Sequence, residues 1–287
     1  MKSLLKSSIL ALFSAICLIA SGCQKHSGKS PEGSKHVLRL ATSSTTVESG
    51  LLDRLVPVFE KKYGVSVEVL MVGSGESLNL ARKGAADVVL IHSREAEDQF
   101  VTEGYGINRK DVMYNDYVIL GPPEDPLKLK EEKDVLSAMK VIADKKADFI
   151  SRGDKSGTHA RELILWNLIN VKPSGKWYMT EKKDQLTMLR AASDQKAYVL
   201  SDRSTYIFNK EPLKLVIVVE GDRKLFNPYG VIAVSPAKVP GVNFESAMKF
   251  IDFITSVDGQ EIICYYGKMR FNKALFTPLA TRNYTCQ

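Results

Sequence analysis

Three short segments of the sequence combine hydroxyl side chains, glycine and arginine in a way that suits the binding of a small anion. They are Thr-Ser-Ser-Thr-Thr at 42–46, Gly-Ser-Gly-Glu-Ser at 73–77 and Ser-Arg-Gly-Asp-Lys-Ser-Gly-Thr at 151–158. Hydroxyl groups donate hydrogen bonds, glycine lets the backbone approach a ligand closely, and arginine adds a forked donor with a permanent charge. Brought together, the three segments would surround a small oxyanion with donors.

The same residues could also be ordinary helix beginnings, because serine and threonine are favoured N-cap residues. For a single segment that structural interpretation is favoured. Three segments, each expected between a strand and a helix, favour binding. The first turn of a helix has unpaired N–H groups and partial positive charge, and so attracts anions.

Catalytic interpretations of these segments are weaker. The segment 73–77 lacks the central serine of a G-x-S-x-G nucleophile elbow. The Lys-Ser-Gly at 155–157 resembles the third motif of penicillin-binding enzymes, but the Ser-x-x-Lys at 137–140 lies too close to it. His92 and His159 could act as bases, but no nucleophile is identifiable for either. We therefore expect a binding protein and not an enzyme.

The cysteines and histidines form no pattern typical of a metal site. The four histidines are scattered, at His26, His36, His92 and His159. None of the Cys/His spacings is typical of zinc. Cys264 and Cys286 would remain in the mature chain, where they could form a disulfide or stay as free thiols. No cofactor and no metal cation is expected.

The N-terminal residues predict a secretory signal followed by a tether. Two lysines precede the apolar stretch 9–20, which is too short to favour a membrane-spanning helix. The Ala-Ser-Gly-Cys at 20–23 resembles a bacterial lipoprotein cleavage box, which implies a signal peptide over 1–23 and lipidation of Cys23. A plain N-terminal anchor is the alternative. Residues 24–35 are polar and are expected to form a flexible tether.

The remaining length and charge set limits on domain count and partners. About 250 residues remain, which suits two modest domains or one large one. The formal net charge of +7 is weak support for an anionic ligand or surface. Lysine and arginine form no block with interleaved aromatic residues, so no nucleic acid partner is expected.

Strands and helices are expected to alternate along the chain. The expected strands are 37–41, 65–72, 87–92, 117–120, 148–151, 197–200, 215–219 and 230–234. The expected helices are 50–63, 77–83, 95–103, 130–143, 159–169, 185–193, 244–256 and 260–265. This order is typical of an α/β fold with a parallel sheet between helices. Ligands of such sheets bind at the carboxyl ends of strands, where the three segments lie.

Two similar segments suggest that the chain crosses twice between domains. Residues 115–126 and 227–241 each contain an asparagine, a tyrosine, an apolar strand and a proline break. With these as crossings, residues 36–121 and 225–287 would form lobe I, and residues 122–224 would form lobe II.

Several motifs in order resemble the tungstate-binding proteins of bacterial ABC importers. They are ATSSTTVESGLLD (41–53), GSGESLNLARKGAADVVLIHSREAEDQFVTEGYGINR (73–109), MYNDYVILGPPEDP (113–126), SRGDKSGTHARELILW (151–166), AYVLSDRSTY (197–206) and NPYGVIAVSP (227–236). The resemblance implies a two-lobe periplasmic-binding-protein type II fold with the ligand in the interdomain cleft. It also implies an ABC permease and its ATPase as partners.

The resemblance implies a function as well. The chain would be a lipoprotein, anchored by lipid to the membrane in the periplasm or at the cell surface, and expected to be a monomer. It would capture a tetrahedral oxyanion, with tungstate favoured, so that tungsten is bound as an oxyanion and not as a metal cation. The alternatives are molybdate, sulfate or phosphate as ligand, or a sensor or adhesion-type lipoprotein that retains the fold.

Position by position, the resemblance assigns the anion contacts. They are Thr42, Ser43, Ser44, Ser74, Gly75, Arg152, Ser156, Gly157 and Thr158. The chain departs from the family at 182–186, where Lys-Lys-Asp-Gln-Leu replaces a glycine-rich stretch. Tungstate, molybdate and sulfate need only donors, whereas hydrogen phosphate also needs an acceptor such as a carboxylate. The nearby carboxylates are Glu48, Glu76 and Asp154, and Asp154 is expected to cap the turn or to hold Arg152.

Overall fold

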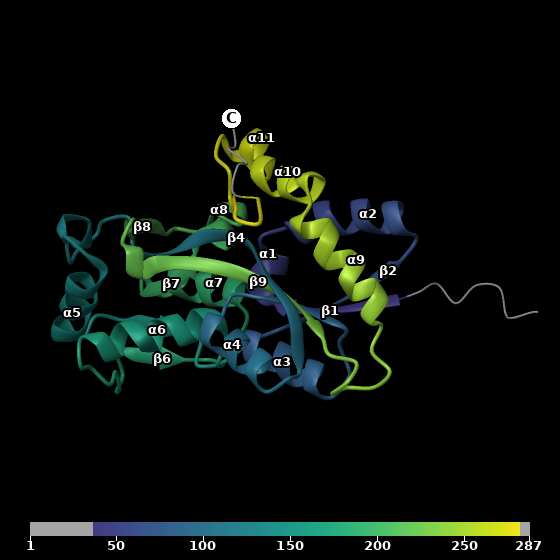
Figure 1. Cartoon of the computed structure of the whole chain (residues 1–287). Coiled ribbons are helices and arrows are strands. Elements are labelled where there is room, and N and C mark those ends of the chain that lie inside the picture. Colours follow the sequence, from purple (N-terminus) through teal and green to yellow (C-terminus); the bar gives the residue numbers. More distant parts are fainter. Residues whose placement is uncertain (1–36, 282–287) are drawn as a thin grey trace, which may run out of the picture. The chain divides into compact units, whose positions relative to one another are not determined.

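The structure, a computed structural model, describes residues 37–281 (Figure 1). The expected signal peptide, the tether, Cys23 and Cys286 lie outside the described residues, and the predictions for them stay predictions.

The strands form one mixed sheet and not the parallel sheet expected from the sequence, because β9 and β4 run antiparallel to their neighbours β3 and β7. Its order is β2-β1-β3-β9-β4-β7-β5-β6, and β8 and β10 each pair with β4 in addition. The strands are β1 (Val37–Ser43), β2 (Ser66–Val72), β3 (Val88–Ile91), β4 (Gly106–Gly121), β5 (Phe149–Ser151), β6 (Tyr178–Thr180), β7 (Tyr198–Asp202), β8 (Val216–Val219), β9 (Phe226–Val234) and β10 (Thr277–Pro278). The parallel neighbours are β2, β1 and β3 at one end and β6, β5 and β7 at the other.

The long strand β4 joins two parts of the sheet. Its residues 106–116 pair antiparallel with β9, and its residues 117–120 pair antiparallel with β7. Asn115 pairs with Asn227, so the two segments that the sequence suggests as crossings lie side by side. The lobe boundaries inferred from the sequence stay a prediction.

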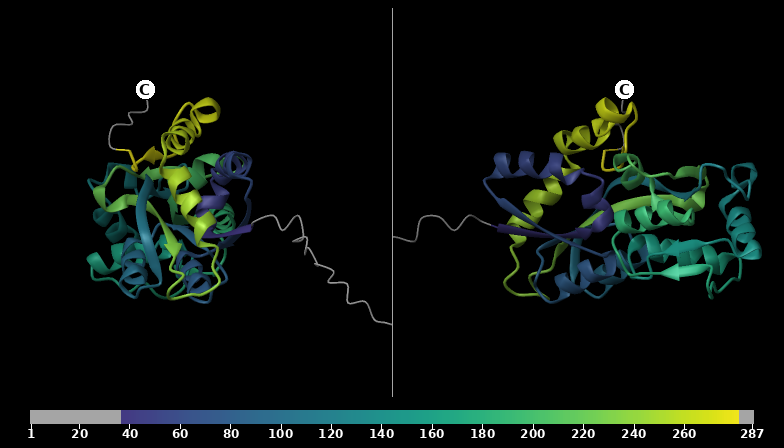
Figure 2. Two further views of the ribbon diagram at one scale, coloured as in Figure 1. Left: turned by 45° about the vertical axis from the view of Figure 1, so that its right-hand side comes forward. Right: turned by 180° about the vertical axis from the view of Figure 1, so that it is seen from behind.

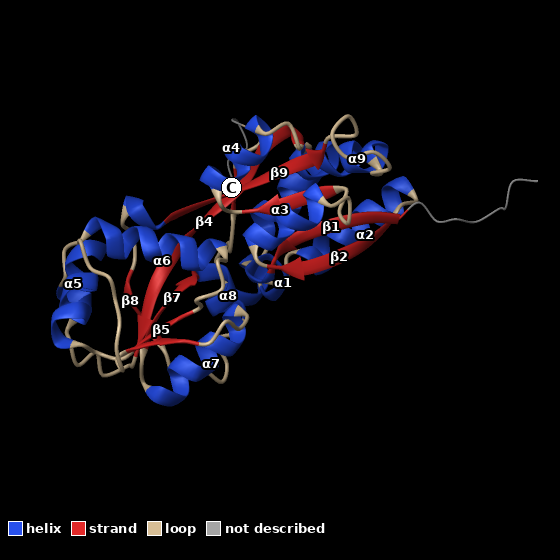
Figure 3. Cartoon of the chain, turned by 90° about the horizontal axis from the view of Figure 1, so that it is seen from below, coloured by secondary structure: helices blue, strands red, loops and turns tan. Residues whose placement is uncertain are grey.

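Helices cover both faces of each part of the sheet (Figures 1 and 3). The helices are α1 (Ser44–Glu48), α2 (Leu52–Tyr63), α3 (Ser74–Arg82), α4 (Arg94–Thr102), α5 (Val135–Lys145), α6 (Gly157–Leu168), α7 (Gln185–Gln195), α8 (Arg203–Phe208), α9 (Phe244–Thr255), α10 (Val257–Tyr265) and α11 (Lys268–Phe271). Around the first part, α2 and α9 pack on one face, and α3 and α4 on the other. Around the second part, α5 and α6 pack on one face and α7 and α8 on the other.

The C-terminal helices α10 and α11 follow α9, and the chain then returns to the sheet (Figure 2). There β10 pairs antiparallel with β4 at Tyr114 and Met113. Gln260 on α10 ties this return in place, because its Nε2 donates to the Val112 carbonyl and its Oε1 accepts from the Ala280 N–H.

Several elements differ from the expectations. The structure adds residues 106–116 of β4, the short helices α1, α8 and α11, and the short strands β6 and β10. The first stretch carries charged side chains that hide its strand pattern. Helices of five and six residues are too short to show a helical period. The helix α3 begins at Ser74, three residues before the expected start, so both Ser74 and Gly75 lie in its first turn.

Candidate functional site

The structure brings the three hydroxyl- and glycine-rich segments together at the ends of β1, β2 and β5. Each segment leads into a helix, namely α1, α3 and α6. Arg152 Nη1 donates to Ser44 Oγ at 3.1 Å, which joins the first and third segments. A Cβ atom added to Gly73 would lie 3.6 Å from Ser156 Cα, so the second segment lies against the third. Figure 3 shows the ends of β1 and β2 beside α1.

The hydroxyls of the first segment mostly bond within the protein. Thr42 Oγ1 donates to the Leu90 carbonyl at 2.6 Å. Ser43 Oγ bonds to Thr45 Oγ1 at 3.0 Å and to Thr46 Oγ1 at 2.8 Å. Ser44 Oγ accepts from Arg152, so its own hydrogen is still available for donation.

Two buried hydroxyls, Ser74 Oγ and Thr158 Oγ1, have no hydrogen-bond partner in the described part of the chain. Both residues are only 1% exposed. A buried polar group without a partner destabilises the folded protein by about 1–3 kcal/mol. These two hydroxyls therefore suit a ligand that accepts a hydrogen bond from each of them. Ser74 begins α3 and Thr158 is in the first turn of α6.

The helices α1 and α3 begin without a side-chain cap, at Ser43 and Gly73 respectively. Their first N–H groups therefore have no side-chain acceptor, which leaves them available to an anion. By contrast, α6 is capped by Ser156, whose Oγ accepts from His159 N at 3.3 Å. The Ser156 hydroxyl can still donate its own hydrogen.

Arg152 supplies buried positive charge among these segments, with only 4% of the residue exposed. Asp154 Oδ2 accepts from its Nε at 3.1 Å and from its Nη2 at 2.6 Å, while Asp154 Oδ1 accepts from Ser156 N. Burial opposes the charged form of Asp154, but the Arg152 charge and the Ser156 bonds outweigh it and lower the pKa of Asp154. Asp154 thus both holds Arg152 and caps the turn.

Gly157 is required at its position because His92 leaves no room for a side chain. A Cβ atom there would lie 2.9 Å from His92 Cε1 and 3.0 Å from the His92 carbonyl oxygen. Gly75 is less constrained, since its added Cβ would approach only Lys155 O, at 3.6 Å.

Glu48 is a half-buried carboxyl at the end of α1. Burial, and then the charge of Asp184, raise the pKa of Glu48 to about 7, although Arg152 acts in the opposite direction. Its Oε2 is buried without a hydrogen-bond partner. Glu76, by contrast, is exposed and accepts from Asn79 Nδ2.

The segment 182–186 starts α7 in place of a glycine-rich stretch. Asp184 is the N-cap and accepts from Thr187 N at 2.7 Å. Lys182 has φ +51° and donates its N–H to the Arg152 carbonyl at 2.9 Å. The segment thus contacts the backbone of the residue that carries the site's charge.

A buried polar network beside the three segments was not predicted. It contains His92, Asn115, Tyr117, Asp202 and Asn227, all buried. Sequence reasoning considered His92 only as a base without a nucleophile. Its position after a buried strand, and the two asparagines at the crossings, were the available signals.

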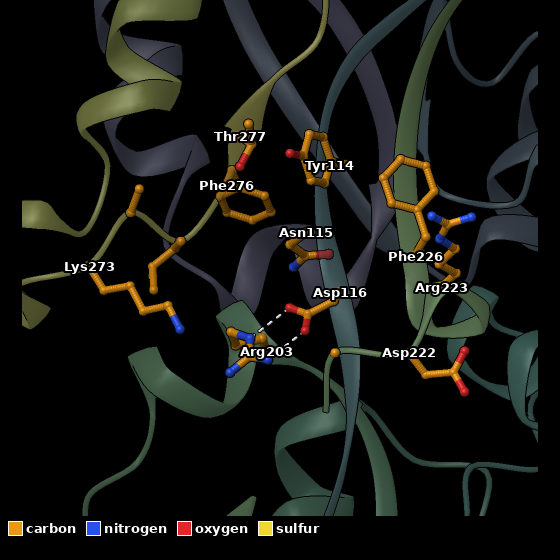
Figure 4. Close-up of a pocket in the computed structure, with 13 residues that line it drawn as sticks. Tyr114, Asn115, Asp116, Arg203, Asp222, Arg223, Phe226, Lys273, Phe276 and Thr277 are labelled. Atoms are coloured by element: carbon orange, nitrogen blue, oxygen red, sulfur yellow. Dashed lines mark hydrogen bonds and ion pairs between the residues drawn. The ribbon is translucent and has the colours of Figure 1, made fainter. Parts of the chain in front are cut away.

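The pocket in Figure 4 is separate from the candidate residues. It has a volume of about 650 Å³ and includes Tyr114, Asp116, Arg203 and Phe226 among its lining residues. None of the nine candidate anion contacts lines it. The candidate site is therefore a set of buried polar groups and not the large open pocket.

Comparison with known proteins gives the family. The PBP superfamily domain matches residues 30–258. The chain is 43% identical to the tungstate-binding protein TupA of Peptoclostridium acidaminophilum over 290 residues, covering 98% of this chain and 100% of that protein. The chain belongs to the PBP superfamily.

Two solved structures are similar to the chain. The tungstate ABC transporter structure from Geobacter sulfurreducens has 47% identity and a TM-score of 0.74, and covers 80% of this chain and 98% of that one. The tungstate-binding protein TupA from Desulfovibrio alaskensis G20 has 39% identity and a TM-score of 0.71, and covers 86% and 100%. The resemblance and the type II periplasmic-binding-protein fold expected from the sequence are confirmed.

The comparisons also bear on whether the chain is an enzyme. The similar proteins are binding proteins and not enzymes, which confirms the expectation of a non-enzymatic chain. Within residues 37–281 no group of three or more His, Cys, Asp or Glu side chains is arranged to hold a metal ion. None of the helices in that range is long and apolar enough to cross a membrane.

Of the two cysteines that could form a disulfide, the structure describes Cys264. Cys264 is buried on α10 and is disulfide-bonded. Because Cys286 lies outside the described residues, the pairing of these two cysteines stays a prediction.

Proposed function

We propose that the chain is an extracytoplasmic substrate-binding protein that captures tungstate and delivers it to an ABC permease. The similar proteins from three bacteria are named for tungstate binding or tungstate transport, and two of them cover 98% and 86% of this chain. The ligand would lie where the ends of β1, β2 and β5 meet, between the predicted lobes.

The observation that carries this proposal is the meeting of Arg152 with two unpartnered donors. Ser74 and Thr158 are buried hydroxyls without a partner in the described chain, and each lies at a helix beginning. Arg152 adds the full positive charge, and Ser44 is within its hydrogen-bond distance. Such a set of donors in a dry site fits a small, fully charged oxyanion.

The carboxylates favour tungstate, molybdate or sulfate over hydrogen phosphate. Asp154 is already committed to Arg152 and Ser156, and Glu76 is exposed. An acceptor for the proton of hydrogen phosphate is therefore missing at these two carboxylates. Glu48, the third nearby carboxyl, has a buried Oε2 without a partner, and phosphate would need this group to face the anion.

Calorimetric titration of residues 24–287 with tungstate, molybdate, sulfate and phosphate tests the proposal. We expect tungstate to bind, and phosphate to bind at least about 100-fold more weakly, a difference of about 2.7 kcal/mol. Absence of binding to all four anions would reject the transport function.

We further propose that Cys23 carries the lipid anchor and that the mature protein is a monomer in the periplasm or at the cell surface. This rests on the Ala-Ser-Gly-Cys box and on the relatives' names. Replacement of Cys23 by serine should move the protein from the membrane fraction to the soluble fraction. Retention in the membrane fraction would contradict lipid anchoring.

A further inference from the structure

His92 lies between the candidate anion site and the crossing strands. Its Nε2 is 3.1 Å from Thr45 Oγ1, and its Nδ1 is 2.8 Å from Asn227 Oδ1. The Tyr117 hydroxyl is 2.9 Å from the same Nδ1, and the ring stacks on Tyr229 at 4.8 Å. The imidazole edge also contacts Gly157 at the start of α6.

The direction of each hydrogen in this network follows from a carboxylate. Asp202 Oδ1 accepts from Thr205 N, so it is an acceptor, and Asn115 must turn its Nδ2 toward it at 3.3 Å. Asn115 Oδ1 is then the acceptor for Asn227 Nδ2, at 2.7 Å. This leaves Asn227 Oδ1 facing His92 Nδ1.

An amide oxygen can only accept, so His92 Nδ1 carries the hydrogen in that contact. A second acceptor, the Tyr117 oxygen, can share the same hydrogen. A neutral imidazole has one N–H group, and so Nε2 has a lone pair. The Thr45 hydroxyl must therefore donate to Nε2.

The same reasoning extends to the next two hydroxyls. Since Thr45 gives its hydrogen to His92, Ser43 must donate in the 3.0 Å contact with Thr45 Oγ1. Thr46 must then donate in its 2.8 Å contact with Ser43 Oγ. All three hydrogens are used inside the protein.

We propose that His92 is a positioning residue of the anion site, which acts by fixing the direction of these hydroxyl hydrogens. Held neutral with its hydrogen on Nδ1, it commits Ser43, Thr45 and Thr46 to one another. Among the residues that the resemblance assigns to the anion, the hydroxyl hydrogens left for it are those of Ser44, Ser74, Ser156 and Thr158. This proposal rests on the proposed oxyanion binding, and it moves Ser43 from an anion contact to a supporting residue.

The surroundings of His92 support a neutral ring. Burial lowers the pKa of His92, against the Asn227 bond and the Asp202 charge, and the charges of Arg152 and Arg161 lower it further. Tyr117 on β4 and Tyr229 on β9 complete the groups that face the ring, and burial raises the pKa of both hydroxyls. Neither tyrosine therefore brings a negative charge to the imidazole at neutral pH.

The direct test is the tautomer itself, measured by long-range ¹H–¹⁵N NMR on histidine-labelled protein without any anion. A chain with His26, His36 and His159 replaced by glutamine leaves His92 as the single labelled histidine. We expect hydrogen on Nδ1 and a bare Nε2 at pH 7. Hydrogen on Nε2, alone or on both nitrogens, would overturn the proposal even if tungstate binds normally.

A double-mutant cycle tests whether His92 acts through Thr45. We expect His92→Gln and Thr45→Val each to weaken tungstate binding about tenfold, the effect of one lost hydrogen bond. The double variant should lose about the same tenfold, because both changes break one chain of bonds. Losses that multiply to about 100-fold would contradict action through Thr45. If a variant does not fold, the NMR result on the chain that retains His92 decides.

Discussion

At the scale of single residues, the site depends on how Arg152 is held. Asp154 accepts two of its hydrogen bonds, and Ser44 accepts a third across the first and third segments. The guanidinium is therefore fixed before any anion arrives. A preorganised donor loses less entropy on binding than a mobile one.

Arg152→Gln should abolish measurable tungstate binding, and Arg152→Lys should weaken it at least tenfold. Lysine keeps the charge but loses the forked geometry, and each bond to a charged group contributes about 1.5–3 kcal/mol. Calorimetry provides the measurement. Arg190→Gln, an exposed arginine on α7, is the matched control and should bind as the parent does. Unchanged affinity in Arg152→Gln would show that Arg152 does not supply the positive charge of the anion site.

The unpartnered hydroxyls give a prediction that separates binding from stability. Ser74→Ala and Thr158→Val remove buried donors that have no partner in the described chain. We expect the free energy of unfolding of the anion-free protein to stay the same or to rise by up to about 1–3 kcal/mol. Tungstate affinity should fall about tenfold. Urea unfolding and calorimetry together test this, and a destabilised variant with normal affinity contradicts it.

At the scale of elements, the beginnings of α1, α3 and α6 meet because three strands end at one place. The sequence predicted most of these strands and helices, since buried β-branched runs such as 88–91 are distinctive. It did not predict α1, because five residues with three hydroxyls show no helical period. The hydrogen-bond directions around His92 could not be predicted from the sequence either. They depend on Asn115, Asp202 and Asn227, which come together from β4, β7 and β9 respectively.

The contact between α6 and His92 predicts a cost for any side chain at residue 157. Gly157→Ala would bring Cβ within 3.0 Å of the His92 ring and backbone. We expect about 1–3 kcal/mol of destabilisation from this overpacking, together with weaker tungstate binding. Gly75→Ala is the matched control, because its Cβ approaches only one atom, at 3.6 Å. Equal stability of the two variants in urea unfolding would contradict the close packing.

Glu48 at the end of α1 lies near Asp184 at the start of α7, and this predicts that tungstate binding depends on pH. The Glu48 pKa is raised to about 7, so the carboxyl is mostly neutral at pH 6 and mostly charged at pH 8. A negative charge near Arg152 opposes an incoming anion, so tungstate affinity should fall as pH rises through 7. Glu48→Gln should bind with little pH dependence between pH 6 and 8. Calorimetry at both pH values tests this, and an identical pH profile in the variant would contradict it.

At the scale of the whole molecule, one sheet connects two parts through β4 and β9. The two similar segments at 115–126 and 227–241 suggested crossings between two lobes, which stay a prediction, and the structure pairs Asn115 with Asn227. The long polar start of β4 was missed, because its charged residues belong to an exposed strand surface. The sequence therefore predicted more of the order of strands and helices than of the hydrogen-bond network around His92.

The central claim is that tungstate binds where the ends of β1, β2 and β5 meet. Anomalous diffraction from crystals grown with tungstate would locate the tungsten atom directly. We expect one strong peak, with the oxyanion's oxygens about 2.7–3.2 Å from the donors of Arg152, Ser74 and Thr158. A tungsten atom bound elsewhere, for example in the pocket lined by Tyr114 and Phe226, would contradict the account.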